Sequence, residues 1–155
     1  MFWDMFIIDA YIGNFDRHGS NWGFIKNLSS DTYCLAPVFD NGSCLFPRVT
    51  NNDEMLNIMN NESEISERVY KFPTSQGKLN GKKSSYFEIT NSLNFPECNK
   101  ALSRFCEKLD SGKIDSIINE TPFISDINKD FYKLMLTCLY QLPLIVCRLK
   151  VCVLV

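Results

Sequence analysis

Hydrophobic side chains surround almost the whole of the first predicted element. Over residues 1–12 one set recurs at helical spacing and a second set fills most of the opposite side: Phe2, Trp3, Phe6, Ile7, Ala10 and Tyr11, then Met5, Ile8 and Ile12. Gly13 and Asn14 then break the helix. A helix that is apolar on nearly every side is typical of the interior of a larger domain. The pattern therefore predicts a buried helix and indicates that further structure belongs upstream of it.

Two short apolar runs follow, with polar turn residues between them. Residues 22–25 and 33–39 are rich in aromatic and branched side chains, and residues 26–31 supply Asn, Ser and Asp. This order is typical of a β-hairpin. We expect two short antiparallel strands that project from the end of the first helical region and return.

Beyond residue 51 the pattern is mainly helical. Asn52 or Asp53 is placed to cap a short helix that carries Met55, Leu56 and Met59. Residues 73–85 are polar and are expected to form a loop. A longer helix begins at Pro96, with Gly112 as its stop signal, and its apolar face holds Cys98, Leu102, Phe105, Cys106 and Leu109. Ser125 is placed to cap a last helix with Ile127, Phe131, Leu134 and Met135 on one face. The sequence predicts an α+β, mostly helical fold.

The last part of the chain changes character. Of residues 138–155, fourteen are apolar, none is acidic and three are cysteines. Pro143, Arg148 and Lys150 interrupt what would otherwise approach the roughly 20 apolar residues of a membrane span. One interpretation is a buried strand or helix. The other, favoured by the abrupt change in composition, is a tail foreign to the domain, such as a frameshifted end. We therefore expect a domain over residues 1–137 and a tail of uncertain status over 138–155.

Composition excludes several classes of protein. A length of 155 residues fits one domain, and 45% hydrophobic with 22% charged residues is ordinary for a globular protein. The net charge of -2 gives no broad basic surface, so direct nucleic-acid binding is not expected. The seven cysteines form no Cys-x-x-Cys pair, which argues against a zinc ribbon and favours reduced core thiols. With neither a signal peptide nor a membrane span expected, the prediction is a cytoplasmic protein.

The densest chemical pattern lies between residues 13 and 42. Asp16 and Asn21 are five positions apart in one predicted loop, and the hairpin of 19 residues that follows returns Asp40 to the same place. Phosphoryl transfer requires a carboxylate that orients the attacking hydroxyl and oxygen ligands that hold magnesium on the phosphates. Each of these residues taken alone is also an ordinary turn residue, and His18, the single histidine, is ordinary at a surface. Their order and spacing together favour the chemical interpretation.

These residues resemble a known family. Asn14-x-Asp16-Arg-His18-x-x-Asn21, a hairpin and then Asp40-Asn-Gly42 look like the catalytic and metal-binding segments of HipA-type kinases, bacterial serine/threonine kinases with an atypical protein-kinase fold. The Asp-Arg-His-x-x-Asn string is also similar to the catalytic loop of phosphatidylinositol kinases. The resemblance covers about 30 residues. It implies Asp16 as catalytic base, Asn21 and Asp40 as ligands of Mg on ATP, and His18 as a support of the loop or of the transferring phosphate.

The same resemblance implies what lies outside this sequence. HipA-type kinases carry the nucleotide-binding lysine and the phosphate-covering loop in an N-terminal lobe, and the sequence begins one helix before its catalytic loop. The expectation is therefore the C-terminal lobe of such a kinase, inactive on its own, whose partners are a serine- or threonine-containing protein substrate and a separate N-lobe or antitoxin-like protein. The alternatives are a non-catalytic remnant or interaction domain with the same fold, and, more weakly, a lipid-kinase-like enzyme.

A glycine- and lysine-rich segment further along the chain is superficially similar to a phosphate-binding loop, but it lacks essential residues of that motif. In Gly77-Lys-Leu-Asn-Gly-Lys-Lys-Ser84, Gln76 stands where that motif needs its first glycine, and Lys83 stands where it needs Ser or Thr. No apolar strand leads into it. Lys78, Lys82 and Lys83 are instead expected in a solvated loop, or as a contact for an acidic or phosphate-bearing partner.

Overall fold

A computed structural model describes residues 2–72 and 74–151, with side chains described as far as residue 140. In this part of the chain seven helices and two β-hairpins follow one another. Their bounds are α1 Phe2–Ile12, β1 Phe24–Asn27, β2 Thr32–Leu35, α2 Asn52–Met59, α3 Glu62–Tyr70, β3 Thr74–Leu79, β4 Lys82–Ser85, α4 Tyr86–Ser92, α5 Pro96–Lys108, α6 Ser111–Glu120 and α7 Asp126–Val151. The predicted α+β, mostly helical fold is confirmed.

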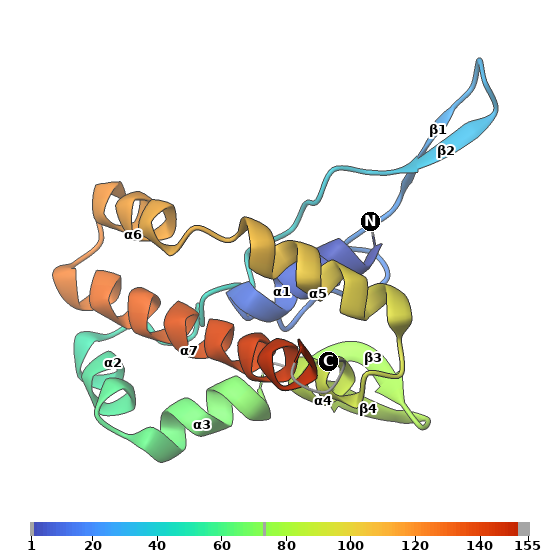
Figure 1. The fold of residues 1–155 in the computed structure, drawn as a ribbon. Helices are drawn as coiled ribbons and strands as arrows, with labels where there is room; N and C mark the ends of the chain where they lie inside the picture. The colour runs from blue at the N-terminus through green and yellow to red at the C-terminus, as the bar shows by residue number, and fades with distance from the viewer. Residues whose placement is uncertain (1, 73, 152–155) are drawn as a thin grey trace.

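Helix α7 is the long axis on which the other helices pack (Figure 1). Helices α2 and α3 contact α7 from one side, and α6, α1 and α5 lie on the other side in Figure 1, where α1 and α5 also pack on each other. One core cluster follows α7 and includes Met55, Ile58, Phe131, Met135 and Leu139. A second joins α1 to α4 and α5 through Phe6, Ile7, Tyr86, Ile89, Cys98 and Leu102. The first helix thus touches both clusters, as its apolar sequence predicts.

Helix α1 ends where the sequence places the break. Gly13 adopts a left-handed φ of +67°, and a Cβ built there would lie 3.5 Å from the Phe46 ring. Glycine is suited to this position because it has no Cβ to strain the backbone. The helix is not buried all round, however, since Phe2 and Ile8 are 41% and 43% exposed. These exposed apolar side chains lie on the faces that the described residues do not cover.

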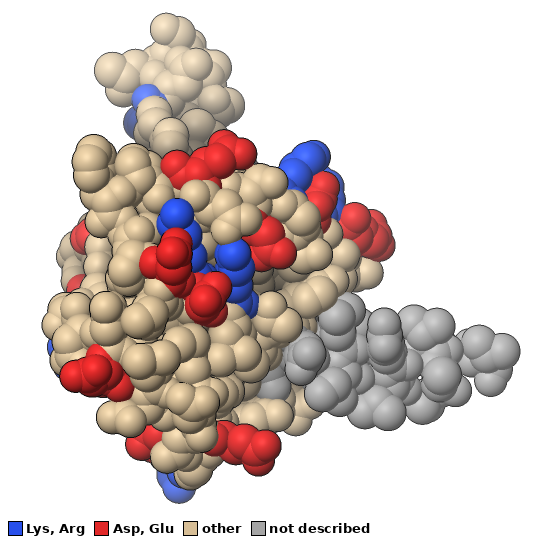
Figure 2. Space-filling view, turned by 90° about the vertical axis from the view of Figure 1, so that its left-hand side faces the viewer, with Lys and Arg blue, Asp and Glu red and all other residues tan. Residues whose placement is uncertain are grey.

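The β1–β2 hairpin projects far from the body of the molecule (Figure 1). Its strands pair antiparallel with Phe24 opposite Leu35 and Asn27 opposite Thr32. The first strand has the predicted length but begins two residues later, and the second begins one residue earlier and ends four residues earlier than predicted. Nearly every residue of the pair is exposed. On the face that Figure 2 shows, most of the projection is uncharged, and Lys26 and Asp31 form an exposed ion pair on this hairpin.

The predicted loop over residues 73–85 is wrong, because residues 74–85 form the β3–β4 hairpin. Asn80 and Gly81, with φ of 51° and 78°, make its turn. This dipeptide favours the left-handed pair of conformations that a two-residue hairpin turn requires. The strands are polar, yet Ser75 is 1% exposed and donates from Oγ to the Ser84 carbonyl at 2.9 Å. A hydrogen bond between buried polar groups here takes the place of apolar packing.

Two predicted helix boundaries also need correction. The cap of α2 is Asn51, whose side chain accepts from the Glu54 backbone N–H at 2.7 Å, one residue before the predicted candidates. Gly112 lies inside α6, whose cap is Asp110, so α5 ends without a glycine. Ser125 does cap the last helix, because its Oγ accepts from the Asn128 N–H at 3.2 Å.

Helix α7 continues without a break through the position where the composition changes. Leu139 is 5% exposed within the core, and the Tyr140 ring lies 6.4 Å from that of Tyr11. Residues 152–155 of the expected tail lie outside the described residues, as do the side chains from 141 onward. No helix in the described ranges is long and apolar enough to cross a membrane. The five cysteines with described side chains are free thiols, of which Cys98 is in the core and Cys34 is exposed on β2.

Candidate functional site

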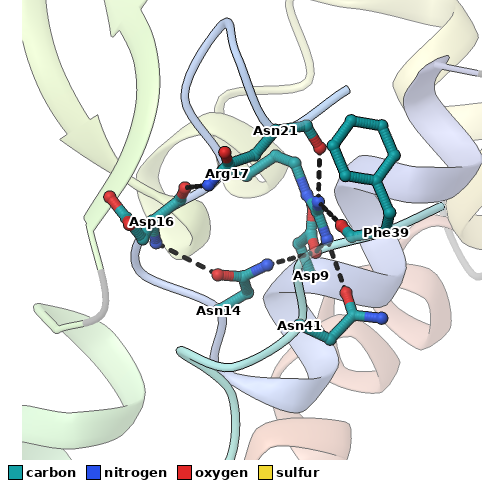
Figure 3. A network of polar contacts seen from close by, with 7 residues as sticks. All are labelled: Asp9, Asn14, Asp16, Arg17, Asn21, Phe39 and Asn41. Atoms are coloured by element: carbon teal, nitrogen blue, oxygen red, sulfur yellow. Dashed lines mark hydrogen bonds and ion pairs between the residues drawn. The ribbon is translucent and has the colours of Figure 1, made fainter. Parts of the chain in front are cut away.

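A buried ion pair lies under the loop that follows α1 (Figure 3). Arg17 donates from Nε to Oδ2 of Asp9 at 2.8 Å and from Nη2 to Oδ1 at 2.9 Å. Their side chains are only 6% and 1% exposed. Asn14 donates from Nδ2 to the same Asp9 carboxylate at 2.9 Å. Two parallel charge-assisted hydrogen bonds of this kind are strong and fix the guanidinium plane, and the hydrogen bond to Asp9 raises the pKa of Arg17 further above its usual value.

The other donors of Arg17 join two segments that are distant in sequence. Nη1 donates to the Asn21 carbonyl at 2.6 Å and to the Phe39 carbonyl, and Nη2 donates to Oδ1 of Asn41 at 2.7 Å. A guanidinium has five N–H donors, and all five are used here. One side chain therefore holds the end of the loop at Asn21 against the segment that contains Asp40.

Asp16 lies on the opposite, outer side of this loop. Its backbone N–H donates to Oδ1 of Asn14 at 3.0 Å, and its carbonyl accepts from Nδ2 of Asn21 at 2.8 Å. Its side chain is 49% exposed, with Oδ2 3.9 Å from Nε2 of the exposed His18. The buried network thus fixes the backbone of Asp16 and leaves its carboxylate accessible.

The structure brings Asn21 and Asp40 to neighbouring positions. The Asn21 amide nitrogen is committed to the Asp16 carbonyl, which turns its Oδ1 away from that bond. Asp40 is exposed, between the two residues that Arg17 binds, and has a left-handed φ of 57°. Aspartate and asparagine tolerate this conformation better than most residues. The hairpin that was predicted to return Asp40 beside Asn21 does so, as the shared contacts with Arg17 show.

The residues present fit magnesium bound through a nucleotide better than a metal held by the protein alone. No group of three or more His, Cys, Asp or Glu side chains in the described part of the chain could hold an ion. The Asp40 carboxylate and the Asn21 amide oxygen could supply two ligands. Magnesium commonly takes one or two protein oxygens together with substrate phosphates and water, so this donor set suits a nucleotide-bound ion.

The sequence interpretation missed the residues that hold the site together. It used Arg17 only as one residue of the Asp-Arg-His motif, and it gave Asp9, which lies within the apolar first helix, no role. A carboxylate inside a helix that is apolar nearly all round was the available signal, because a buried charge needs a partner. The partner of Asp9 is Arg17, which lies eight residues later within the Asp-Arg-His motif.

Comparison with known proteins gives this geometry a context. No protein-family model matches the sequence. The chain is 44% identical over 138 residues to the serine/threonine-protein kinase CtkA of Helicobacter pylori strain J99. This chain is related to a serine/threonine kinase. The crystal structure of a Helicobacter pylori proinflammatory kinase CtkA superposes with a TM-score of 0.85 at 39% identity.

The match covers most of this chain but only about half of CtkA. The CtkA crystal structure aligns with 96% of this chain but with only 56% of its own, and the CtkA sequence match covers 87% of this chain and 42% of CtkA. The chain therefore spans about half the length of the kinase that it resembles. The mixed α/β fold with two small antiparallel sheets is that of the matching part of CtkA.

Proposed function

We propose that this chain is the catalytic half of an ATP-dependent serine/threonine kinase of the HipA type. The observation that carries the proposal is the Arg17 clamp, which joins the loop bearing Asp16 and Asn21 to the segment bearing Asp40 in a homologue of a known kinase. The reaction is transfer of the γ-phosphoryl group of ATP to a serine or threonine hydroxyl of a protein.

Each residue of the motif has one task in this proposal. Asp16 accepts a hydrogen bond from the substrate hydroxyl and orients it toward the phosphorus, for which its exposed carboxylate is suited. Asn21 Oδ1 and the Asp40 carboxylate hold magnesium, which when bound neutralises charge on the phosphates. His18, beside Asp16, supports the loop or the charge of the transferring group. Arg17 keeps Asn21 and Asp40 at a fixed separation.

The projecting hairpin supports a role for the part of the kinase that the chain does not span. Phe24, Ile25, Leu28 and Tyr33 are between 50% and 86% exposed. Apolar side chains gathered on one projection are typical of a surface that another domain covers. In this proposal the missing part supplies the nucleotide-binding lysine and packs on this hairpin, and the chain alone transfers no phosphate.

The exposed hairpin also favours a second candidate of a different class. A non-catalytic interaction domain that kept this fold would use the same apolar surface for a partner protein and would bind neither ATP nor magnesium. Binding of MgATP therefore separates the two candidates.

The test is calorimetric titration of MgATP into this chain fused to the part of the Helicobacter kinase that it does not match. We expect binding that needs magnesium and that Asp40→Asn weakens at least tenfold, because asparagine keeps the left-handed backbone but removes the charge. Asp31→Asn is the matched control, since Asp31 is also exposed with a φ of 50°. Absence of magnesium-dependent binding, or equal losses in the two variants, would contradict the proposal and favour the interaction domain.

A further inference from the structure

A cavity of about 330 Å³ opens beside the proposed catalytic loop. Aromatic side chains from four segments of the chain line it: Phe2, Trp3, Phe6, Trp22, Tyr86 and Phe95. Strand β3 completes it with Gln76, Gly77 and Lys78. Residues 3, 22, 77 and 95 are far apart in sequence, so this cavity exists only in the folded protein.

The cavity is continuous with the loop that carries Asp16. Gly19 and Trp22 belong to that loop region and line the cavity. On the other side of Asp16, the Phe15 ring lies 5.6 Å from that of Phe72, two residues before β3. Strand β3 therefore runs beside the catalytic loop, and both contribute residues to the cavity wall.

The charges around the cavity are unequal. Arg17 lies in its wall, but its donors are all used by Asp9 and by the two segments that it joins. Lys78 is exposed at the rim and makes no ion pair with the described residues, whereas Lys26 of the other hairpin is paired with Asp31 at 2.7 Å. The cavity thus combines an aromatic interior with one available positive charge.

We propose that this cavity is a substrate-specificity subsite that takes a large apolar side chain of the protein substrate close to its phosphorylated residue. An acidic residue of the same peptide segment faces Lys78. A volume near 330 Å³ is at the lower end of the range for ligand pockets and suffices for one aromatic side chain. The inference rests on the proposed function for the identity of the peptide as a kinase substrate, but binding of the peptide needs neither ATP nor magnesium.

The chain contains its own reporter for this site. It has two tryptophans, and both of them line the cavity. Intrinsic fluorescence is therefore measured on the whole chain while seven-residue peptides with a central serine are added. The panel places Phe at each of the three positions on either side of the serine, with Asp at one neighbouring position. Matched peptides replace Phe by Ala or Asp by Lys.

We expect at least one Phe and Asp peptide to shift the tryptophan emission saturably, and its Ala and Lys counterparts to bind at least tenfold more weakly. Lys78→Glu should weaken binding of the Asp peptide at least tenfold and strengthen binding of the Lys peptide. Lys82→Glu, on the same hairpin but outside the cavity wall, should change both affinities by less than twofold.

A third variant fills the cavity. A Cβ added at Gly19 meets nothing within 4 Å and needs no left-handed backbone, so Gly19→Leu is compatible with the fold. We expect it to abolish the peptide-induced emission shift. Circular dichroism and thermal unfolding identify any variant that has lost the fold, and in that event the Lys78 and Lys82 pair decides the result.

Three results would overturn the inference. They are no saturable shift with any Phe peptide, equal effects of Lys78→Glu and Lys82→Glu, or emission that changes with protein concentration alone, which would assign the cavity to a second copy of the chain. Failure of the proposed function is recognised separately. A fused kinase that binds the peptide but not MgATP would contradict phosphoryl transfer and leave the peptide subsite supported.

Discussion

Asp9 and Asp16 belong to the same short stretch of chain, yet the fold treats them in opposite ways. The Asp9 side chain is 1% exposed and binds Arg17 and Asn14, whereas the Asp16 side chain is 49% exposed and is held through its backbone. The first carboxylate lies on the inner side of the loop and the second on the outer side. Asn14 contacts both residues, with its amide nitrogen on one and its amide oxygen on the other.

The difference shows how the loop can be held by a buried network and still present an accessible carboxylate. Asp9, Asn14 and Arg17 form a buried inner layer of this loop. Every polar group of this layer is paired, since no buried side-chain nitrogen or oxygen in the described residues lacks a partner. A satisfied buried network fixes the backbone, and the side chains that project from its outer side, such as Asp16, remain accessible at the surface. Substitutions in the inner layer should therefore change stability, and substitutions in the outer layer should change chemistry.

The largest effect on stability is expected for Arg17→Met. This change leaves the Asp9 carboxylate buried without its cation, and breaking a buried ion pair costs about 3–5 kcal/mol. The free energy of unfolding, measured by urea denaturation, should fall by that amount. Arg104→Met is the matched control, because Arg104 pairs with Asp4 at 2.6 Å but both side chains are more than a third exposed, and such pairs contribute up to about 1 kcal/mol. Equal losses of unfolding free energy in the two variants would show that the buried ion pair stabilises the fold no more than the exposed one.

A double substitution sharpens this comparison. In Asp9→Leu with Arg17→Met, neither charge remains to be buried without a partner. We expect the double variant to be more stable than Arg17→Met alone, as double-mutant analysis of coupled residues predicts. A further loss equal to that of the single change would contradict the coupling.

The projecting hairpin should affect association rather than stability. Ile25→Lys and Leu28→Lys together replace side chains that are 50% and 86% exposed, so the free energy of unfolding of this chain should change by less than about 0.5 kcal/mol per site. Binding to the part of the kinase that the chain does not span should weaken at least tenfold, as surface plasmon resonance would measure. Ile117→Lys, on α6 and 66% exposed, is the control. A comparable loss with Ile117→Lys would remove the hairpin from the interface.

A smaller effect is expected for His18→Gln in the fused kinase. His18 is exposed and its Nε2 is 3.9 Å from Asp16 Oδ2, so it can assist the site without being essential to it. Phosphoryl transfer should slow several-fold, with the unfolding midpoint unchanged. If transfer is lost completely, His18 acts directly in the reaction.

A further prediction concerns the pH dependence of stability at alkaline pH. Burial raises the pKa of the Cys44 and Cys98 thiols from 9.0 to about 11. Above pH 9 the unfolded chain releases these protons while the folded chain retains them. Proton release therefore stabilises the unfolded state, and the free energy of unfolding falls between pH 9 and 11. Below pH 9 these groups contribute no pH dependence. Urea midpoints at pH 8, 9 and 10.5 should show the decline, which Cys98→Ala reduces and Cys34→Ala leaves unchanged.

The elements that could be predicted from the sequence are those with a strong local signal. The apolar period of α1, the cap of α7 at Ser125 and the first hairpin are of this kind. The β3–β4 hairpin was missed because its buried positions are serines, although the dipeptide Asn80-Gly81 is typical of a hairpin turn.

The site was predictable in part. The spacing of Asp16, Asn21 and Asp40 selected residues that the fold brings to neighbouring positions. Spacing does not tell which side of a loop faces the protein, so the role of Arg17 required the structure. The aromatic cavity could not be predicted at all, because its walls come from α1, the loop, β3, α4 and the N-cap residue of α5.

The central claim is that the outer side of this loop carries out phosphoryl transfer, and Asp16→Asn tests it most directly. The measurement is transfer of labelled phosphate from ATP to serine or threonine of a protein by the fused kinase, together with its free energy of unfolding. Loss of a positioned catalytic base typically lowers the rate by about 10²–10⁴-fold. We predict a loss of that size with unfolding unchanged to within about 0.5 kcal/mol. Transfer at the original rate by a folded Asp16→Asn enzyme would contradict the account.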